Sequence, residues 1–172
     1  MSADIFSSDT NRVILDLPDP TATDALGRAL ATHVAPRDVI ALFGDLGAGK
    51  TSLARALVQA LLAADGTMED VPSPTFTLVQ TYETSTLPIW HADLYRLSDP
   101  SELIELGLEE ALDTGLLIIE WPDRMGDELP RDRLDVFLEE KQEGRTVQLT
   151  AWGSMWEERM GLIAAAFKAE QG

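Results

Sequence analysis

The sequence predicts an α/β fold, a three-layer sandwich in which helices flank a mostly parallel central sheet with antiparallel strands at its edges. Two runs, Val39–Phe43 and Leu116–Ile119, are apolar without alternation, which is typical of strands buried on both faces of a parallel sheet. Good helix formers fill Gly49–Ala64, and apolar residues lie almost all round this helix, so it should pack deeply. Shorter runs rich in β-branched and aromatic residues supply the expected antiparallel strands.

The other elements follow from turn and cap signals. Val13–Leu17 is expected to form a short strand that the prolines of 18–20 end in a turn, and a helix should follow, capped by Thr21 or Thr23 and ended by Pro36. We expect residues 1–172 to form one domain, with 153–172 as a C-terminal helical extension. Further expected strands are Thr75–Tyr82, Ile89–Leu94, Leu134–Leu138 and Thr146–Ala151, and further expected helices run from Ser98 or Asp99 to Leu106, where Gly107 stops the helix, and from Met155 to Lys168.

Length and composition fit an ordinary globular domain. The chain has 172 residues, of which 45% are hydrophobic, and it contains no cysteine. Neither a disulfide framework nor a thiolate metal site can therefore form. Residues 1–11 are polar and acidic, without the basic and apolar segments of an export signal, and no apolar run approaches the length of a membrane span. We expect a cytoplasmic protein without a membrane segment.

The net charge bears on partners. Thirty acidic residues against 13 basic ones give a formal net charge of −17. Proteins that bind nucleic acid tightly use clustered Lys and Arg to neutralise phosphates, and the sequence shows no such cluster. Tight direct binding of nucleic acid is therefore not expected. An acidic surface of this kind suits either solubility or contact with a basic patch on another protein.

The string Gly44-Asp45-Leu46-Gly47-Ala48-Gly49-Lys50-Thr51 follows the first buried run and has the pattern of a P-loop. Its three glycines allow backbone angles that bring N–H groups close to phosphate oxygens, and the helix from Gly49 directs its positive end at them. Lys50 can reach the β and γ phosphates, and the Thr51 hydroxyl can ligate Mg²⁺. The setting predicts a P-loop NTPase-like fold that binds Mg-ATP. Asp45 fits a turn residue as well as a contact to metal-bound water.

Two carboxylates are candidates for the metal side of the nucleotide. Glu120 ends the second buried run, where open α/β sheets place their ligands, although a charged residue there could also simply turn to water. Asp93 lies in His91–Tyr95, where alternation places His91, Asp93 and Tyr95 on one strand face. A polar face open to water is the alternative for Asp93.

Four further residues near these motifs have two interpretations each. His91 could act as a base, although a hydrogen-bonded structural histidine is favoured. Arg96 could stabilise phosphate charge or pair with a nearby acid. Trp121 could stack beside the nucleotide or pack in the core. Thr75 could sense the γ phosphate, although its hydroxyl more simply satisfies the turn backbone.

Taken together, these motifs resemble the TsaE (YjeE) family, the small ATPase of bacterial tRNA threonylcarbamoyladenosine synthesis. The resemblance covers about Thr21 to Ala151 and rests on the order and spacing of several strings rather than on the P-loop alone. The segments before Thr21 and after Trp152 fall outside it. The strings are Gly44–Ser52, Ser73–Val79, His91–Leu97, Glu105–Leu108 and Ile119–Arg124.

The resemblance implies an ATPase that binds the TsaB and TsaD proteins, which attach a threonylcarbamoyl group to adenosine 37 of tRNAs that read codons beginning with A. This family does not perform the transfer itself; its ATP cycle would reset or remodel the partner complex, and hydrolysis would be weak without partners. Carried over by position, Lys50 and Thr51 serve phosphate and Mg²⁺, Glu120 and Asp93 serve the metal or the attacking water, and Thr75 serves the γ-phosphate region. The implied nucleotide contacts are Asp45, Leu46, Gly47, Ala48, Gly49, Lys50, Thr51, Ser52, Thr75 and Trp121, the implied catalytic residues are Glu120, Asp93 and Lys50, and the implied metal ligands are Thr51 and Glu120.

Three alternatives remain open from the residues. In a small-molecule kinase, Arg124, Arg131 and Arg133 would form a phosphate-binding lid. A GTPase-like switch has a superficial match in Asp123–Gly126, but the sequence contains no Asn-Lys-x-Asp guanine-reading motif. A nucleotide-gated binding module with negligible hydrolysis of its own is the third alternative.

Overall fold

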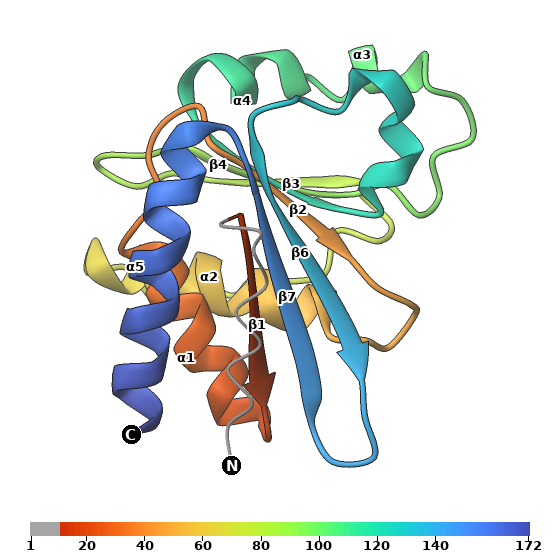
Figure 1. Cartoon of the computed structure of the whole chain (residues 1–172). Coiled ribbons are helices and arrows are strands. Elements are labelled where there is room, and N and C mark those ends of the chain that lie inside the picture. The colour runs from red at the N-terminus through yellow and green to blue at the C-terminus, as the bar shows by residue number, and fades with distance from the viewer. Residues whose placement is uncertain (1–10) are drawn as a thin grey trace.

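The computed structural model describes residues 11–172 as a seven-stranded sheet with helices on both faces (Figure 1). The expectation that the N-terminal segment carries no export signal falls on residues 1–10, which lie outside the described residues. The elements are β1 (Arg12–Leu17), α1 (Pro20–Ala31), β2 (Val39–Phe43), α2 (Lys50–Ala64), β3 (Val79–Tyr82), β4 (Ile89–Asp93), α3 (Glu102–Glu105), α4 (Leu108–Thr114), β5 (Leu116–Glu120), 3₁₀ turns over Pro122–Glu128, β6 (Arg133–Glu140), β7 (Arg145–Trp152) and α5 (Ser154–Gln171).

The strand order is β1-β7-β6-β2-β5-β4-β3. The four central strands β6, β2, β5 and β4 are parallel. The strands at both edges are antiparallel: β3 pairs with β4 on one side, and β7 and β1 follow β6 on the other. This arrangement confirms the predicted fold class, including the antiparallel edges.

The central strands are buried on both faces because two cores enclose the sheet. On one face, α2 packs over β5, α5 packs over β7 and β1, and α1 packs against α2 and α5, and their core includes alternate residues of β2 and β5 such as Ile40 and Ile118. On the other face, α4 and the 3₁₀ turns cover the intervening residues, such as Val39 and Ile119 (Figure 1). A strand with a core on each face cannot alternate apolar and polar side chains, which explains the continuous apolar runs in the sequence.

Close packing of α1 on α2 fixes the helix that follows the glycine-rich loop. A Cβ atom on Gly27 of α1 would lie 2.6 Å from the Cβ atom of Ala56 on α2, so the glycine permits the approach. α1 thereby holds one side of α2. The N-terminal end of α2 lies at the sheet edge where β2, β4 and β5 end.

Several predicted boundaries were wrong for local reasons. The cap of α1 is Asp19 rather than Thr21 or Thr23: the Asp19 carboxylate accepts from the Ala22 amide at 3.0 Å, and Pro20 occupies the first helical turn. The same helix ends at Ala31, before the expected Pro36. β3 begins only at Val79, because Leu78 adopts a φ of 67° and its amide bonds the Pro74 carbonyl in a turn.

The connection between β4 and β5 also differs from the expectation. The expected helix from Ser98 or Asp99 to Leu106 is reduced to α3, one turn long. Gly107 ends this turn, as predicted, but with a φ of 71° it also precedes a further helix, α4, which was not predicted. The 3₁₀ turns after β5 were not predicted either.

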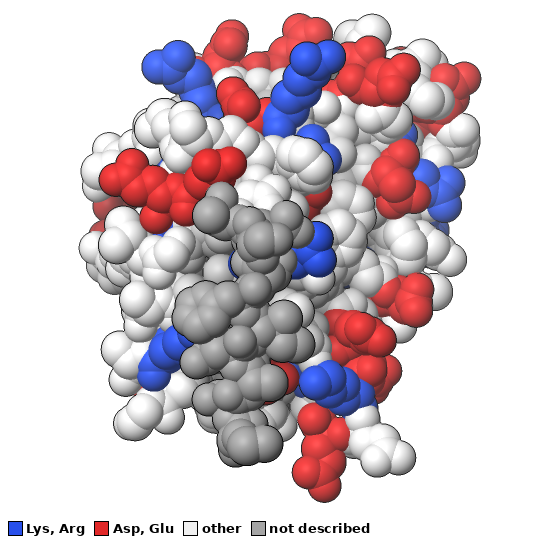
Figure 2. Space-filling model, in the orientation of Figure 1, with Lys and Arg blue, Asp and Glu red and all other residues white. Residues whose placement is uncertain are grey.

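Acidic side chains are spread widely over the face of the molecule shown in Figure 2, and the Lys and Arg side chains among them are scattered. Among the described residues on that face, no continuous basic patch forms. Within residues 11–172, no helix has both the length and the apolar character needed to cross a bilayer.

Candidate functional site

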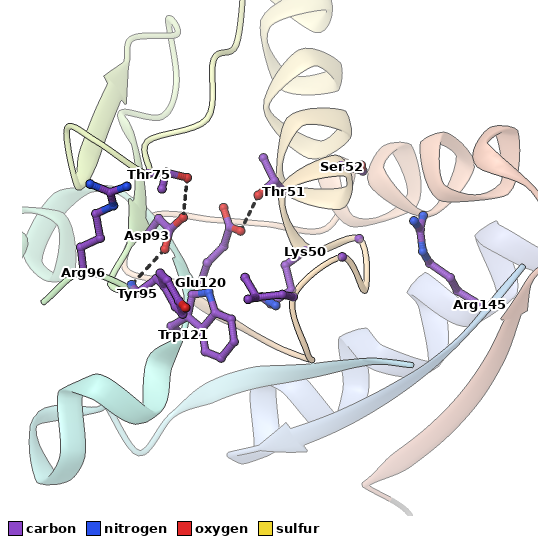
Figure 3. A pocket seen from close by; sticks show the side chains of 13 residues that line it. Lys50, Thr51, Ser52, Thr75, Asp93, Tyr95, Arg96, Glu120, Trp121 and Arg145 are labelled. Carbon is purple, nitrogen blue, oxygen red and sulfur yellow. Dashed lines mark hydrogen bonds between the residues drawn. The ribbon is translucent and has the colours of Figure 1, made fainter. Parts of the chain in front are cut away.

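A pocket of about 420 Å³ lies at the sheet edge where β2, β4 and β5 end (Figure 3). Its walls come from five parts of the chain that are distant in sequence: the glycine-rich loop with the start of α2, the turn before β3, the end of β4, the end of β5, and the start of β7. The lining residues are Leu46, Gly47, Gly49, Lys50, Thr51, Ser52, Thr75, Asp93, Tyr95, Arg96, Glu120, Trp121 and Arg145.

The glycine-rich loop runs directly from β2 into α2. Gly49 precedes the helix with a φ of 107°, a conformation that side-chain-bearing residues rarely adopt. Gly44 is required for a different reason, because a Cβ atom there would lie 2.6 Å from the carbonyl oxygen of Leu138. The loop therefore keeps its backbone N–H groups close to the pocket and to the positive end of a 15-residue helix.

Lys50 is folded over this loop. Its Nζ donates to the carbonyl oxygens of Gly44 and Asp45, the second at 2.9 Å, and lies 4.2 Å from the centre of the Trp121 ring. The residue is only 5% exposed. Burial lowers the pKa of the Lys50 ammonium from its ordinary value, and the nearby carboxylates of Glu120 and Asp93 oppose this effect. The ammonium is thus a buried cation held beside the loop.

Glu120 faces Thr51 across the pocket. The Thr51 hydroxyl donates to Glu120 Oε1 at 2.6 Å, and the other carboxylate oxygen lies 2.6 Å from His91 Nε2. His91 is fully buried, and its Nδ1 has no hydrogen-bond partner. Donation from Nε2 to the Glu120 carboxylate fits this arrangement. His91 is therefore a buried partner that fixes the Glu120 carboxylate.

The second carboxylate, Asp93, ends β4 next to Glu120, its register partner on β5. Its Oδ2 accepts from the Thr75 hydroxyl at 3.0 Å, and its Oδ1 accepts from the Tyr95 amide at 3.0 Å. Thr75 itself lies 2.7 Å from the Ser73 hydroxyl. The turn that displaces the expected start of β3 is what places Thr75 against Asp93 (Figure 3).

Trp121 closes one wall of the pocket. It follows β5 with a φ of 58°, and its ring lies 5.0 Å from that of Tyr95. A bulky residue with positive φ is strained and persists where its surroundings hold it. Here the Tyr95 ring and the Lys50 ammonium both lie against the indole ring.

The structure thus brings together most of the residues that the sequence pointed to. Asp45 and Ala48 do not line the pocket with their side chains; Ala48 is buried, and Asp45 contributes its carbonyl oxygen to Lys50. Arg96 lines the pocket and lies 4.4 Å from the Phe76 ring rather than pairing with an acid. Tyr95, predicted only to share a strand face with His91 and Asp93, lies beyond the end of β4 and also lines the pocket.

The arginines of the kinase alternative lie elsewhere. Arg133 donates to both Asp135 oxygens and to the Pro130 carbonyl. Arg124 and Arg131 are also absent from the described residues that line the pocket. The site instead includes Arg145, which sequence reasoning missed because a lone arginine after Gly144 at the start of a strand carries no local signal.

The oxygen ligands of this pocket fit Mg²⁺. Thr51 offers a hydroxyl and Glu120 a carboxylate, both hard donors of the kind that Mg²⁺ prefers. Within residues 11–172, no three His, Asp or Glu side chains gather as a metal cluster.

Comparison with known proteins decides the family. A family model described as "Threonylcarbamoyl adenosine biosynthesis protein TsaE" matches residues 17–147. The chain belongs to the TsaE family. The matched range contains every residue that lines the pocket and ends before α5. Its members take part in the biosynthesis of threonylcarbamoyladenosine in tRNA, and the resemblance seen in the sequence motifs is confirmed.

Individual TsaE relatives agree. The chain is 41% identical over 132 residues to the tRNA threonylcarbamoyladenosine biosynthesis protein TsaE of Rickettsia felis, covering 77% of this chain and 75% of that protein. It is 36% identical over 141 residues to the TsaE protein of Bacillus subtilis, covering 81% and 85%. The crystal structure of Bacillus subtilis YdiB matches the fold with a TM-score of 0.73 and 28% identity, covering 90% of this chain and 95% of that one.

Proposed function

We propose that this TsaE-family protein is a Mg-ATP-binding ATPase required for threonylcarbamoyladenosine formation at position 37 of tRNA. It acts on a TsaB–TsaD complex and does not itself transfer the threonylcarbamoyl group. The observation that carries the ATPase assignment is the 2.6 Å hydrogen bond between Thr51 and Glu120 beside a buried lysine and a glycine-rich loop. This combination supplies a phosphate-binding loop, a cation and a metal-side carboxylate within one pocket.

The proposed roles follow from the contacts of each side chain. The loop amides and Lys50 bind the β and γ phosphates. Thr51 and Glu120 would hold Mg²⁺, which neutralises charge on the phosphate oxygens. Asp93, positioned by Thr75, accepts a hydrogen bond from the attacking water on the γ-phosphate side. Hydrolysis then forms a bond from the water oxygen to the γ phosphorus and breaks the bond to the β–γ bridging oxygen, which leaves with ADP.

Action through partners fits the charge of the chain. A net charge of −17 does not favour a protein that holds tRNA tightly by itself. The relatives of this chain are tRNA threonylcarbamoyladenosine biosynthesis proteins. A role on tRNA through the TsaB and TsaD proteins reconciles these two facts, and TsaB and TsaD would stimulate a weak intrinsic hydrolysis.

The test has a cellular and a biochemical arm. In a strain depleted of this protein, threonylcarbamoyladenosine in bulk tRNA should fall, and wild-type chain but not Lys50→Ala should restore it. In vitro, purified TsaB and TsaD should raise the rate of ATP hydrolysis. An unchanged nucleoside level on depletion would overturn the pathway role. Hydrolysis that TsaB and TsaD do not change would overturn the partner-dependent ATPase, and phosphoryl transfer to a metabolite would support the kinase alternative instead.

A further inference from the structure

Arg96 is a cation of the pocket wall that the proposed function leaves unused. It lies three residues after Asp93, the last residue of β4, and lines the same pocket as Thr75 and Glu120. In Figure 3 its guanidinium lies on the side of Thr75 and Asp93, away from Lys50. A triphosphate in this pocket would therefore meet one cation at the loop and a second on the wall that faces its γ phosphate.

The Arg96 guanidinium is not engaged by an acidic side chain. Within residues 11–172, no carboxylate pairs with it and it donates no hydrogen bond, whereas Arg133 and Arg159 are each held by a carboxylate. Its neighbour is the Phe76 ring, whose centre lies 4.4 Å from Arg96 Cζ. Because an aromatic ring offers no oxygen acceptor, this contact leaves the fork of N–H donors available for a phosphate.

Phe76 holds this arginine from the surface of the molecule. Its side chain is 80% exposed, so the ring adds little to the core. Phe76 directly follows Thr75, whose hydroxyl donates to Asp93. The ring that contacts Arg96 therefore belongs to the same turn that places Thr75 against Asp93. This turn links the position of the guanidinium to the part of the pocket proposed for the γ phosphate.

ATP hydrolysis develops negative charge at the place where Arg96 lies. In the proposed reaction the water oxygen bonds to the γ phosphorus and gives a proton to the Asp93 carboxylate. The β–γ bridging oxygen leaves with the bonding electron pair as part of ADP. In the transition state, negative charge spreads over the oxygens of the transferring group, and a cation there lowers the barrier. Arg96 is the only cation among the described pocket residues that follow or end β4 and β5, which are Asp93, Tyr95, Arg96, Glu120 and Trp121.

We propose that Arg96 contacts the γ-phosphoryl group and stabilises its charge in the transition state, and that Phe76 is the positioning residue that holds the guanidinium at this wall. This inference rests on the proposed function, because it takes ATP to be hydrolysed in this pocket. The chain then carries its own phosphoryl-stabilising arginine, and a partner protein does not have to supply one.

The experiment separates the hydrolytic step from nucleotide binding. Hydrolysis of bound ATP is followed in a single turnover with saturating TsaB and TsaD, and ADP affinity is measured by calorimetry. Arg96→Ala should slow the turnover by about 100-fold or more, the cost of losing one donor group aimed at transition-state charge. Its affinity for ADP, which lacks the γ phosphate, should stay within about twofold of wild type. Arg96→Lys should recover only part of the rate, because it keeps the charge but not the fork of donors. Arg131→Ala, an exposed arginine that does not line the pocket, is the matched control.

Variants of Phe76 test the positioning role. Phe76→Leu should slow the single turnover by about fivefold, the size of one exposed cation–π contact, with ADP affinity unchanged. Phe76→Tyr keeps a ring and should keep the wild-type rate. In a chain that already carries Arg96→Ala, Phe76→Leu should cause no further loss. Losses that multiply would show that Phe76 does not act through Arg96, and would overturn its positioning role.

Three results would overturn the catalytic role of Arg96. These are a normal single-turnover rate in Arg96→Ala, a loss of ADP affinity as large as the loss of rate, and a normal rate reached only at a higher concentration of TsaB and TsaD. The last result would assign Arg96 to partner contact instead. If the wild-type chain hydrolysed no ATP in the presence of TsaB and TsaD, the proposed function itself would fail, and this role with it.

Discussion

The Thr51 hydroxyl donates a hydrogen bond to the Glu120 carboxylate at 2.6 Å, although the two residues stand 69 positions apart in the sequence. Neighbouring parallel strands produce this meeting: β2 leads through the glycine-rich loop to Thr51, and β5 ends at Glu120 beside it. His91 holds the other carboxylate oxygen from β4. Three elements at the sheet edge therefore fix the Glu120 carboxylate beside the glycine-rich loop.

Glu120→Gln should leave Mg-ATP binding within about threefold of wild type and slow hydrolysis by about 100-fold or more, because the isosteric amide keeps the packing but loses the charge. Binding by calorimetry and phosphate release under saturating ATP measure the two effects separately. Glu110→Gln, an exposed carboxylate on α4, is the control and should change neither. Normal turnover in Glu120→Gln would assign the metal-side role to Asp93.

Lys50→Ala should weaken Mg-ATP binding by at least about 30-fold, because it removes a desolvated cation from the phosphate loop. Lys50→Met retains most of the side-chain volume and should show the same loss, which separates charge from packing. Lys168→Ala removes an exposed charge on α5 and should have no effect. Unchanged affinity in both Lys50 variants would contradict the assignment of the loop.

The parts of this site that could be predicted are those marked by a local pattern in the sequence. The unbroken apolar runs of β2 and β5 and the loop string are local patterns, so the fold class, Lys50, Thr51 and Glu120 could be predicted. Their proximity to one another followed from the rule that parallel strands end at a common sheet edge. The role of His91 as a partner of Glu120 could not be predicted, because it depends on side-chain orientation across two strands.

The errors have equally specific causes. The turn at Leu78 shortens β3 and places the Thr75 hydroxyl against Asp93, and β propensity does not detect such a turn. Gly107 ends the turn of α3, as predicted, but it also directly precedes α4. Arg145 lies in no sequence motif. Its place beside Gly49 follows only from the fold of the β6–β7 hairpin, so it could not be predicted.

The pH dependence of binding should follow Lys50. Burial lowers the pKa of its ammonium below the ordinary value of 10.5. Only the charged form attracts phosphate. The affinity for Mg-ATP therefore has its full value below the lowered pKa and falls as the pH rises through it, at a lower pH than for an ordinary lysine. Calorimetric titrations with Mg-ATP between neutral and alkaline pH check this. In Lys50→Arg, whose guanidinium stays charged, the alkaline loss should disappear; its persistence would point to another group.

Asp93 and Thr75 should act as a pair in hydrolysis. Asp93→Asn should slow turnover by about tenfold or more while ATP affinity changes little, because the carboxylate serves the attacking water rather than the phosphates. Thr75→Val should have a smaller effect, since it removes only the hydroxyl that positions Asp93 at 3.0 Å. In the double variant the two losses should not add, with a coupling of about 1 kcal/mol in the activation free energy. Strict additivity would show that the two residues work independently.

Trp121 should report nucleotide binding through its fluorescence. The Lys50 ammonium lies 4.2 Å from the centre of its ring, and a bound triphosphate would draw that ammonium toward the phosphates and change the environment of the indole. Addition of Mg-ATP should therefore change tryptophan emission in the wild-type chain. Trp121→Phe should abolish the change, whereas Trp152→Phe should keep it, because Trp152 donates to Asp135 away from the pocket. A fluorescence change that persists in Trp121→Phe would show that another tryptophan responds to the nucleotide. It would contradict the expectation that movement of Lys50 causes the change.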